Sequence, residues 1–218
     1  MTSVWLIRHG ESESNVGLPT TKPTEFTQLT NRGHQQAQAI AAVVPPPDLI
    51  VTSPYLRAKQ TAQPTIDCFP YCPQAEWQVQ EFDYLTPVAK AAGWPEGGTS
   101  QMDVLQLSKA YWQRRDPYYS SGVGAESFAE LMQRVAEMLQ QLHQLEGKTV
   151  LVFSHSGFMR AVLWSSLLRQ PEVNSRMMDK FYYFINSIRI PNGAIIKLHL
   201  HDQETFFSPI LIHHLQGL

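Results

Sequence analysis

Four short apolar or β-branched runs, separated by longer stretches with helical periodicity, constrain the fold of this chain more than any other feature. The runs cover residues 3–8, 48–52, 76–80 and 149–154, and each is bounded by turn or cap residues. Strands that alternate with helices are typical of a mainly parallel sheet with helices on both faces. We therefore expect an α/β fold, built as a three-layer αβα sandwich around one central sheet.

Capping residues place helices in the gaps between these runs. Thr30 can cap a helix that the prolines at 45–47 prevent from continuing. Ser53 followed by Pro54 has the pattern of an N-cap and a first helical residue, so a second helix should begin there. This helix carries Arg57 in its first turn, which places Arg57 near the carboxyl end of the preceding strand.

The second half of the chain continues the alternation before its pattern changes. Ser127 and Glu130 form a capping box for a helix that should end at Gly147. The C-terminal quarter is interpreted as hairpins, with turn signals at residues 191–193 and 201–202. Because no repeat, low-complexity tract or long linker interrupts the chain, residues 1–218 are predicted to form a single domain.

Charge and composition limit the partners of such a domain. The formal net charge is −2, which gives no electrostatic reason to expect nucleic acid or an anionic membrane surface as a partner. No segment is apolar over the length of a bilayer, and the first residues lack a secretory signal, so a cytoplasmic protein is expected. Cys68 and Cys72 are expected to be free thiols, since two cysteines are too few for a disulfide framework.

Chemically active residues fall just beyond each predicted strand. They are Arg8 and His9 after the first strand, Arg57 after the second, Glu81 after the third and His155 after the fourth. Open α/β sheets bind ligands at the carboxyl ends of their strands. If the four strands are parallel neighbours, two guanidiniums, two imidazoles and a carboxylate converge in one crevice.

These residue types suit the transfer of a phosphoryl group. Such a group spreads its charge over three oxygens, which the planar guanidiniums of Arg8 and Arg57 can hold with bidentate hydrogen bonds. A neutral imidazole is a competent nucleophile near neutral pH, so His9 needs no separate base. Glu81 is the candidate carboxyl group for protonating the leaving alkoxide and then activating water. Because the arginines neutralise the charge, neither a metal nor another cofactor is expected.

Further segments, in a fixed order, extend the pattern around Arg8-His9-Gly10. They are Leu6–Asn15, Leu29–Ala37, Thr52–Ala62, Gly124–Ser127 and Phe153–Gly157. Together these segments resemble the histidine phosphatase superfamily, the phosphoglycerate mutase-like proteins, and they cover most of the chain. The resemblance implies the fold of that superfamily and a phosphorylated small molecule as substrate, with a phosphoprotein as a further option.

The resemblance also implies a role for each matched residue. His9 is the residue to be phosphorylated, while Arg8, Arg57 and His155 hold the phosphoryl oxygens and Asn15 adds a further contact. Structural alternatives stay open for three of these residues. Arg57 is then a solvated charge at the start of a helix, His155 a buried capping residue, and Asn15 a residue that satisfies a turn.

The proton donor follows the family pattern less closely. Many members place a glutamate a few residues before a Gly-x-Trp-Glu-Gly segment, whereas here the related segment is Gly93–Gly97, further along the chain. Glu81 is the first candidate, and Asp83 and Glu96 are the alternatives. Glu81 also has a structural alternative as a solvated charge at the end of a strand.

His199 and His201 would share one face of a late strand, at a spacing that is open to a metal ion. No neighbouring carboxylate or cysteine completes a coordination shell, so a structural interpretation of the pair is favoured. We therefore assign no metal site.

An unusually aromatic excursion lies at about 82–125. One hypothesis is that it lines the mouth of the site, as a lid or specificity segment. The other is that residues 99–115 form an amphipathic helix, which buries Met102, Leu105 and either Tyr111 or Trp112 on the domain. The sequence favours neither hypothesis over the other.

Three functions are consistent with these residues. The first is a metal-independent phosphomonoesterase of the histidine acid phosphatase type, in which water resolves a phosphohistidine. The second is a mutase that returns the phosphoryl group to its substrate, and the third is a phospholigand-binding or scaffold protein. The phosphatase is preferred, because residues 16–20 match the characteristic mutase segment poorly and because both arginines and both histidines are present. The natural substrate and the oligomeric state stay open.

Overall fold

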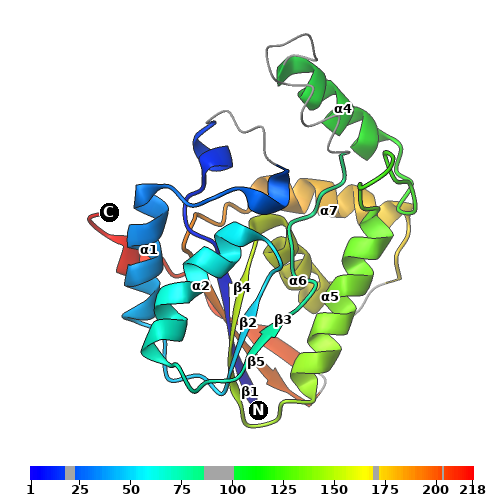
Figure 1. The fold of residues 1–218 in the computed structure, drawn as a ribbon. Coiled ribbons are helices and arrows are strands. Elements are labelled where there is room, and N and C mark those ends of the chain that lie inside the picture. The colour runs from blue at the N-terminus through cyan, green and yellow to red at the C-terminus, as the bar shows by residue number, and fades with distance from the viewer. Residues whose placement is uncertain (18–22, 86–100, 169–171, 203) are drawn as a thin grey trace.

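The structure is a computed structural model that describes residues 1–17, 23–85, 101–168, 172–202 and 204–218 (Figure 1). Its strands are β1 (Thr2–Arg8), β2 (Leu49–Thr52), β3 (Gln74–Glu76), β4 (Thr149–Ser154), β5 (Ile195–His201) and β6 (Glu204–Phe207). Its α-helices are α1 (Asn31–Ala41), α2 (Leu56–Cys68), α4 (Gln101–Gln113), α5 (Phe128–His143), α6 (Ser156–Leu168) and α7 (Ser175–Ser187). Short 3₁₀ helices are η1 (Glu13–Val16), η2 (Thr24–Phe26) and η3 (His213–Leu215).

In the described residues, the strands form one sheet in the order β3-β2-β4-β1-β5-β6. The first four strands of this order are parallel, while β5 and β6 add an antiparallel edge beside β1. The predicted neighbouring parallel strands are therefore confirmed. Their carboxyl ends meet at one edge of the sheet.

Helices cover both faces of this sheet, as the alternation of strands and helices predicts. The helices α1 and α2 pack on one face, and α5, α6 and α7 lie on the other (Figure 1). A hydrophobic core lies on each face of the sheet, and alternate strand residues belong to different cores. Leu6 and Val152 face the α5–α6 side, whereas Ile7 and Phe153 face the α1–α2 side. The three-layer αβα sandwich is thus confirmed.

The predicted helix starts are partly confirmed. Thr30 caps α1 by accepting a hydrogen bond from the Gly33 N–H, and Ser127 and Glu130 form the expected capping box of α5. The prediction for α2 is wrong by a few residues, because the helix begins at Leu56 rather than at Pro54. The Ser53 hydroxyl accepts the Tyr55 N–H at 3.2 Å, which forms a turn before the helix instead of its cap.

Two predicted strand regions are corrected. The third strand is Gln74–Glu76 rather than residues 76–80, so Glu81 follows an irregular segment and not the strand itself. The C-terminal quarter is not made only of hairpins, since it contains α7. The β5–β6 pair is antiparallel on either side of residues 201–202, as the second turn signal predicts. The turn at 191–193 instead leads from α7 into β5.

The aromatic excursion contains the helix α4, as the second hypothesis for this segment predicts. Tyr111 and Trp112 on α4 are buried in the core on the α5–α6 side. Leu105 differs from the prediction, because its side chain is 65% exposed. Trp94 and the Met102 side chain lie outside the described residues. No helix in the described ranges has the length and apolar character to span a membrane.

Candidate active site

The site forms where β1 and β4 end side by side. His9 directly follows β1, and its N–H donates to the Ser154 carbonyl at the end of β4 at 2.9 Å. His155 follows Ser154, and the centres of the two imidazole rings are 4.9 Å apart. Arg57 comes from the first turn of α2. The structure therefore brings together three residues that are far apart in the sequence.

The His9 ring is held in one tautomer by the backbone. Its Nδ1 lies 2.7 Å from the Gly10 carbonyl oxygen, which can only accept a hydrogen bond. Nδ1 must then carry the proton, and Nε2 keeps its lone pair. The Arg57 Nε–H group faces that lone pair at 3.3 Å. This arrangement points the unprotonated nitrogen of His9 at the guanidinium.

The surroundings of His9 keep its ring neutral. The side chain is only 3% exposed, and burial is the largest effect that lowers its pKa well below the usual value. The charges of Arg57 and Arg8 lower the pKa further, against the smaller opposing effect of the Gly10 hydrogen bond. The His9 imidazole is therefore neutral at physiological pH.

His155 is completely buried and uses a different partner. Its Nε2 lies 2.8 Å from the Ser53 hydroxyl oxygen, while its Nδ1 has no partner among the described residues. Burial, followed by the charge of Arg57, lowers the pKa of His155 well below its usual value. The Ser53 oxygen already accepts the Tyr55 N–H, so its own O–H can donate to Nε2. Nδ1–H is then the donor left for a ligand.

Backbone carbonyls anchor the two arginines. The Arg57 Nη1 donates to the Thr24 carbonyl at 2.8 Å, and the Arg8 Nη1 donates to the Ile190 carbonyl at 2.6 Å. The Arg8 Nε is buried and has no partner within the described ranges. Burial is the largest effect that lowers the pKa of Arg8, to about 10, so both guanidiniums stay charged at neutral pH. Each keeps donor groups for an anion.

Glu81 lies at the start of α6, close to these cations. Its Oε1 accepts the Gly157 N–H at 2.7 Å and the Phe82 N–H at 3.0 Å. Gly157 permits this contact, because a Cβ atom at that position would collide with the same oxygen. Glu81 also interacts electrostatically with Arg8 and Arg57. Its carboxyl group is therefore held at the start of α6, two residues after His155, through Oε1.

The alternative proton donors are placed differently. Asp83 accepts a hydrogen bond of 2.6 Å from the Tyr55 hydroxyl, so its Oδ2 is already engaged. Glu96 lies outside the described residues. The Tyr55 ring also meets His155 edge-on at 5.2 Å and lies under the Arg57 guanidinium at 4.9 Å. Tyr55 and Asp83 thus line the same side of the site as Glu81.

Asn15 lies in η1 and is fixed by its side-chain oxygen. That oxygen accepts hydrogen bonds from the Ser12 N–H, the Ser12 hydroxyl and the Asn192 side-chain amide, the last at 2.8 Å. The same Asn192 amide donates to the carbonyls of His9 and Gly10, both at 3.2 Å. The side-chain oxygen of Asn15 therefore stabilises the turn at residues 12–15, and its NH₂ group is left for a ligand.

The loop after His9 needs glycine for a close approach of two chain segments. A Cβ on Gly10 would lie 2.5 Å from the Gly33 carbonyl oxygen, and a Cβ on Gly33 would collide with the Glu11 carbonyl. The Gly10 N–H donates to the Thr61 hydroxyl on α2 at 2.9 Å. His9 is thus positioned by the start of α1 as well as by the sheet.

Sequence reasoning missed three residues of this site. Ser53 was interpreted only as a helix cap, Asn192 only as part of a turn, and no role was predicted for Tyr55. A polar residue at the end of the second strand was the available signal for Ser53. Asn192 contacts His9 from 183 residues away, so no local pattern could have identified it.

Comparison with known proteins places this geometry in a family. The sequence profile of the histidine phosphatase superfamily (branch 1) matches residues 4–205. The chain belongs to this superfamily. The chain is also similar to a protein from Bacillus subtilis named uncharacterized phosphatase PhoE, at 30% identity over 179 residues, or 80% of this chain and 82% of the relative. Phosphatase activity is therefore supported at the level of the superfamily.

Solved structures support the same fold. A phosphoserine phosphatase from Entamoeba histolytica, in complex with 3-phosphoglyceric acid, has a TM-score of 0.72 at 22% identity and covers 99% of this chain and 100% of its own. A putative α-ribazole-5′-phosphate phosphatase from Escherichia coli has a TM-score of 0.70 at 21% identity and covers 100% and 98%. At these identities the likeness extends to the fold alone.

The described residues contain no group of three or more histidine, cysteine, aspartate or glutamate side chains that could hold a metal ion. Cys68 and Cys72 are both free thiols, as predicted. The polar groups at the candidate site are therefore those of the two histidines, the two arginines and their neighbours.

Proposed function

We propose that the chain is a phosphomonoesterase in which His9 becomes transiently phosphorylated. The observation that carries the proposal is the pair of hydrogen bonds on His9, with Nδ1 held by a carbonyl and Nε2 left facing Arg57. A buried neutral imidazole with a fixed tautomer needs no separate base to attack phosphorus. The enzyme is then a phosphoric monoester hydrolase of the histidine acid phosphatase type.

In the first step, the lone pair of His9 Nε2 forms a bond to phosphorus while the bond from phosphorus to the ester oxygen breaks. The leaving alkoxide takes a proton from Glu81 Oε2. Arg8, Arg57 and the Nδ1–H of His155 hold the three phosphoryl oxygens, and the NH₂ of Asn15 adds a further donor. The charge of the transition state is balanced by these side chains, so no step requires a metal ion.

In the second step, a water molecule attacks the phosphohistidine. Glu81, now ionised, accepts a proton from that water as the oxygen bonds to phosphorus and the bond between phosphorus and Nε2 breaks. Inorganic phosphate leaves, and both His9 and Glu81 return to their starting states. The same carboxyl group thus acts first as an acid and then as a base.

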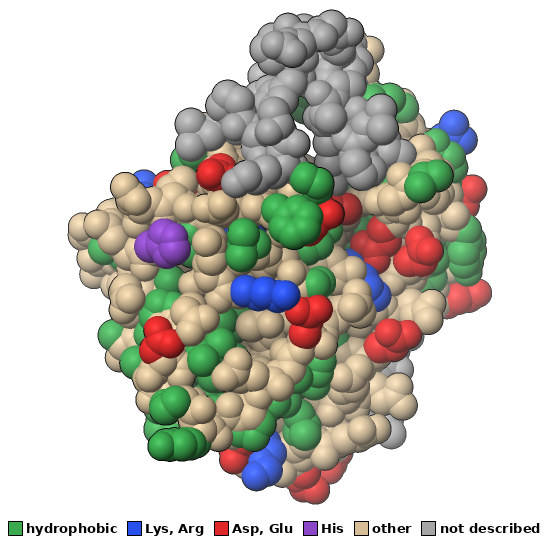
Figure 2. Space-filling view, viewed as in Figure 1, with side chains coloured by type: hydrophobic (Ala, Val, Ile, Leu, Met, Phe, Trp, Pro, Cys, Tyr) green, Lys and Arg blue, Asp and Glu red, His purple; other side chains and the backbone are tan. Residues whose placement is uncertain are grey.

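The leaving group is assigned to a cavity of about 330 Å³ on the Glu81 side of the site. Its lining includes Tyr55, Glu81, Asp83, Glu126 and Arg134. Acidic side chains gather on this face over α5 (Figure 2). Because the structural relatives were solved with phosphoserine and 3-phosphoglyceric acid, we assign a phosphorylated small molecule as the substrate class. The chain is then a single domain, and its excursion at about 82–125 selects the leaving group.

Labelling tests the proposal directly. Wild-type protein is incubated with a ³²P-labelled phosphomonoester and quenched in alkali, and the expected product is acid-labile, alkali-stable label on His9. The His9→Ala variant should carry none. If the folded wild type hydrolyses substrate without such label, the mechanism is wrong. Dominant return of label to glycerate, rather than release to water, would replace the phosphatase with a mutase.

A further inference from the structure

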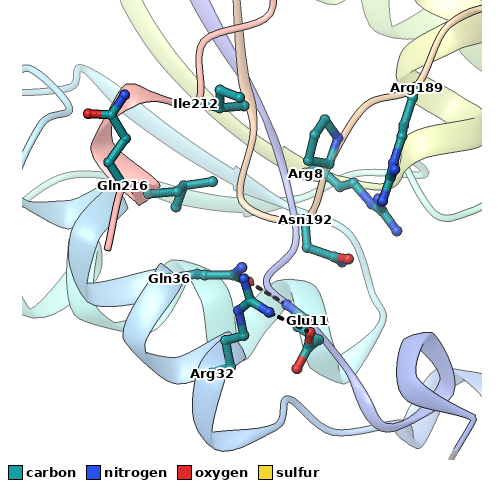
Figure 3. Close-up of a pocket in the computed structure, with 10 residues that line it drawn as sticks. Arg8, Glu11, Arg32, Gln36, Arg189, Asn192, Ile212 and Gln216 are labelled. Atoms are coloured by element: carbon teal, nitrogen blue, oxygen red, sulfur yellow. Dashed lines mark hydrogen bonds and ion pairs between the residues drawn. The ribbon is translucent and has the colours of Figure 1, made fainter. Parts of the chain in front are cut away.

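A second cavity lies on the other side of Arg8, between the start of α1, the residues before β5 and the η3 region (Figure 3). Its volume is about 340 Å³, within the range of small-molecule sites. Its lining residues are Arg8, Glu11, Arg32, Gln36, Arg189, Pro191, Asn192, Ile212, Leu215 and Gln216. Neither of the two active-site histidines lines it.

The lining is strongly cationic. It has three guanidiniums but a single carboxylate, that of Glu11. That carboxylate is already engaged, because one of its oxygens accepts the Thr30 hydroxyl at 2.8 Å and the other lies 3.9 Å from Arg32. No ion pair of Arg189 occurs within the described ranges. The side chains that line the cavity thus carry more positive than negative charge.

Arg8 and Arg189 concentrate this charge at one end of the cavity. Figure 3 shows both side chains directed to the same corner, beside Asn192. The two guanidiniums repel each other, and the charge of Arg189 contributes to the lowered pKa of Arg8. The buried Arg8 Nε has no hydrogen-bond partner in the described part of the chain. An anion at this corner would relieve the repulsion and offer acceptors to both guanidiniums.

Neutral donors surround the same space. The Gln36 Oε1 accepts the Glu11 N–H at 2.7 Å, which leaves its NH₂ group available. Gln216 lines the cavity from the other side of Gln36 (Figure 3). Amide donors and guanidiniums together are the usual ligands of carboxylate and phosphate groups in proteins.

We propose that this cavity binds a small oxyanion, a carboxylate or phosphate group, in addition to the phosphoryl group held at His9. The proposal goes beyond the hydrolytic function and stands on the cavity alone. Arg8 borders both sites, so an anion in the cavity acts on catalysis through the charge and position of that guanidinium. The oxyanion belongs either to the substrate itself or to a separate effector, and the experiments below separate these sources.

Calorimetric titration with inorganic sulfate at low ionic strength tests the binding site. Wild type should bind sulfate at two sites. Arg189→Gln should weaken the cavity site by about tenfold or more, because a charge-assisted hydrogen bond is lost. Arg176→Gln, which changes an exposed arginine on α7 away from the cavity, is the matched control and should bind as wild type. Arg57→Ala should weaken only the catalytic site.

Two results would overturn the proposal. One is that Arg57→Ala abolishes all sulfate binding, and the other is that both Arg189→Gln and Arg32→Gln bind sulfate as wild type does. Circular dichroism and thermal unfolding confirm that each variant is folded. Because binding is measured without turnover, these results are independent of whether His9 is phosphorylated.

Kinetics separate the two sources of the anion. The rates with 3-phosphoglycerate, which carries a carboxylate, are compared with those of glycerol 3-phosphate, which does not. If the anion belongs to the substrate, Arg189→Gln raises KM about tenfold for 3-phosphoglycerate alone. If the anion is a separate effector, Arg189→Gln leaves KM for both substrates unchanged. Sulfate then changes the rate of wild type partly in a non-competitive manner, and Arg189→Gln removes that part. If Arg189→Gln alters neither the KM values nor the sulfate effect, both sources of the anion are contradicted.

Discussion

The carboxyl ends of β1 and β4 are neighbours in the sheet, and each is followed directly by a buried histidine. At the end of β1, a backbone carbonyl holds His9 through Nδ1. At the end of β4, the Ser53 hydroxyl meets His155 through Nε2. The two rings are only 4.9 Å apart, and burial lowers the pKa of both. They differ mainly in the chemical nature of the hydrogen-bond partner.

In the proposed mechanism, this difference separates a nucleophile from a donor. A carbonyl can only accept, so the tautomer of His9 is fixed with its lone pair on Nε2. A hydroxyl can donate or accept, so the tautomer of His155 can follow the ligand that it meets. Two histidines at equivalent positions of neighbouring strands can therefore take different roles without any difference in burial.

The largest expected effect is a difference between removing the two rings. His9→Ala should lower kcat/KM by about 10⁴-fold or more, because the nucleophile itself is lost. His155→Ala should lower it by about 10²- to 10³-fold, because it removes one donor to the transferred group. Steady-state kinetics with an aryl phosphate measure both values. Equal losses would show that the two strand ends do not differ in role.

The next effect concerns Glu81, which α6 holds beside the β4 end. Gly157→Ala should displace the carboxyl group, since the added Cβ would collide with Oε1. With alkyl phosphates, Glu81→Gln and Gly157→Ala should each reduce turnover by about 10²-fold or more. With activated aryl phosphates, whose leaving group departs without a proton, both variants should reduce turnover much less. The double variant should be no worse than Glu81→Gln alone. Additive losses would contradict a shared cause.

A smaller effect is expected from the hydroxyl that meets His155. Ser53→Ala should reduce kcat by about tenfold, because a buried nitrogen loses its partner, and Ser53→Thr should restore most of the rate. Stability measured by urea unfolding should fall by about 1–2 kcal/mol in the alanine variant only. If threonine fails to rescue the rate, the hydroxyl group is not the feature that matters.

The smallest expected effect is on stability as a function of pH. Each histidine has a folded pKa below its unfolded value of about 6.5, so the unfolded state binds protons first as the pH falls. This stabilisation is fully present above about pH 6.5 and decreases below it, by about 1 kcal/mol per histidine between pH 7.5 and 5.5. Urea titrations at both pH values should show a smaller decrease in His155→Asn than in wild type. An unchanged decrease would mean that His155 binds protons equally in the folded and unfolded states, which contradicts a lowered folded pKa.

The strands and caps of the parallel part of the sheet were predictable because their signals are local. The β1 and β4 runs are continuous apolar segments, and the capping pairs of α1 and α5 lie within four residues. The third strand was predicted at residues 76–80 because apolar residues there indicate burial, but burial does not require pairing in a sheet. Val79 is buried, yet it lies in the irregular segment after β3. Its carbonyl instead accepts the Ser154 hydroxyl.

The helix α7 was missed although its sequence carries the pattern of a helix. Asn174 caps it by accepting the Met177 N–H, and Met177, Met178 and Phe181 form its buried side. The turn signals near residues 191–193 and 201–202 dominated the interpretation of this region. The proximity of His9, Arg57 and His155, in contrast, was predictable because parallel topology brings strand ends together. The residues that orient them, such as Asn192, are specified only by contacts between distant segments.

The order in which the chain is synthesised adds a consequence to the pairing of β1. This strand precedes the other described strands along the chain, yet its neighbours in the sheet are β4 and β5, and Asn192 supports the His9 loop. A nascent chain cannot hold the His9 loop in place until residues 149–201 have left the ribosome. Such distant pairing is slow to form. In the proposed mechanism, partial chains without these residues should therefore lack activity.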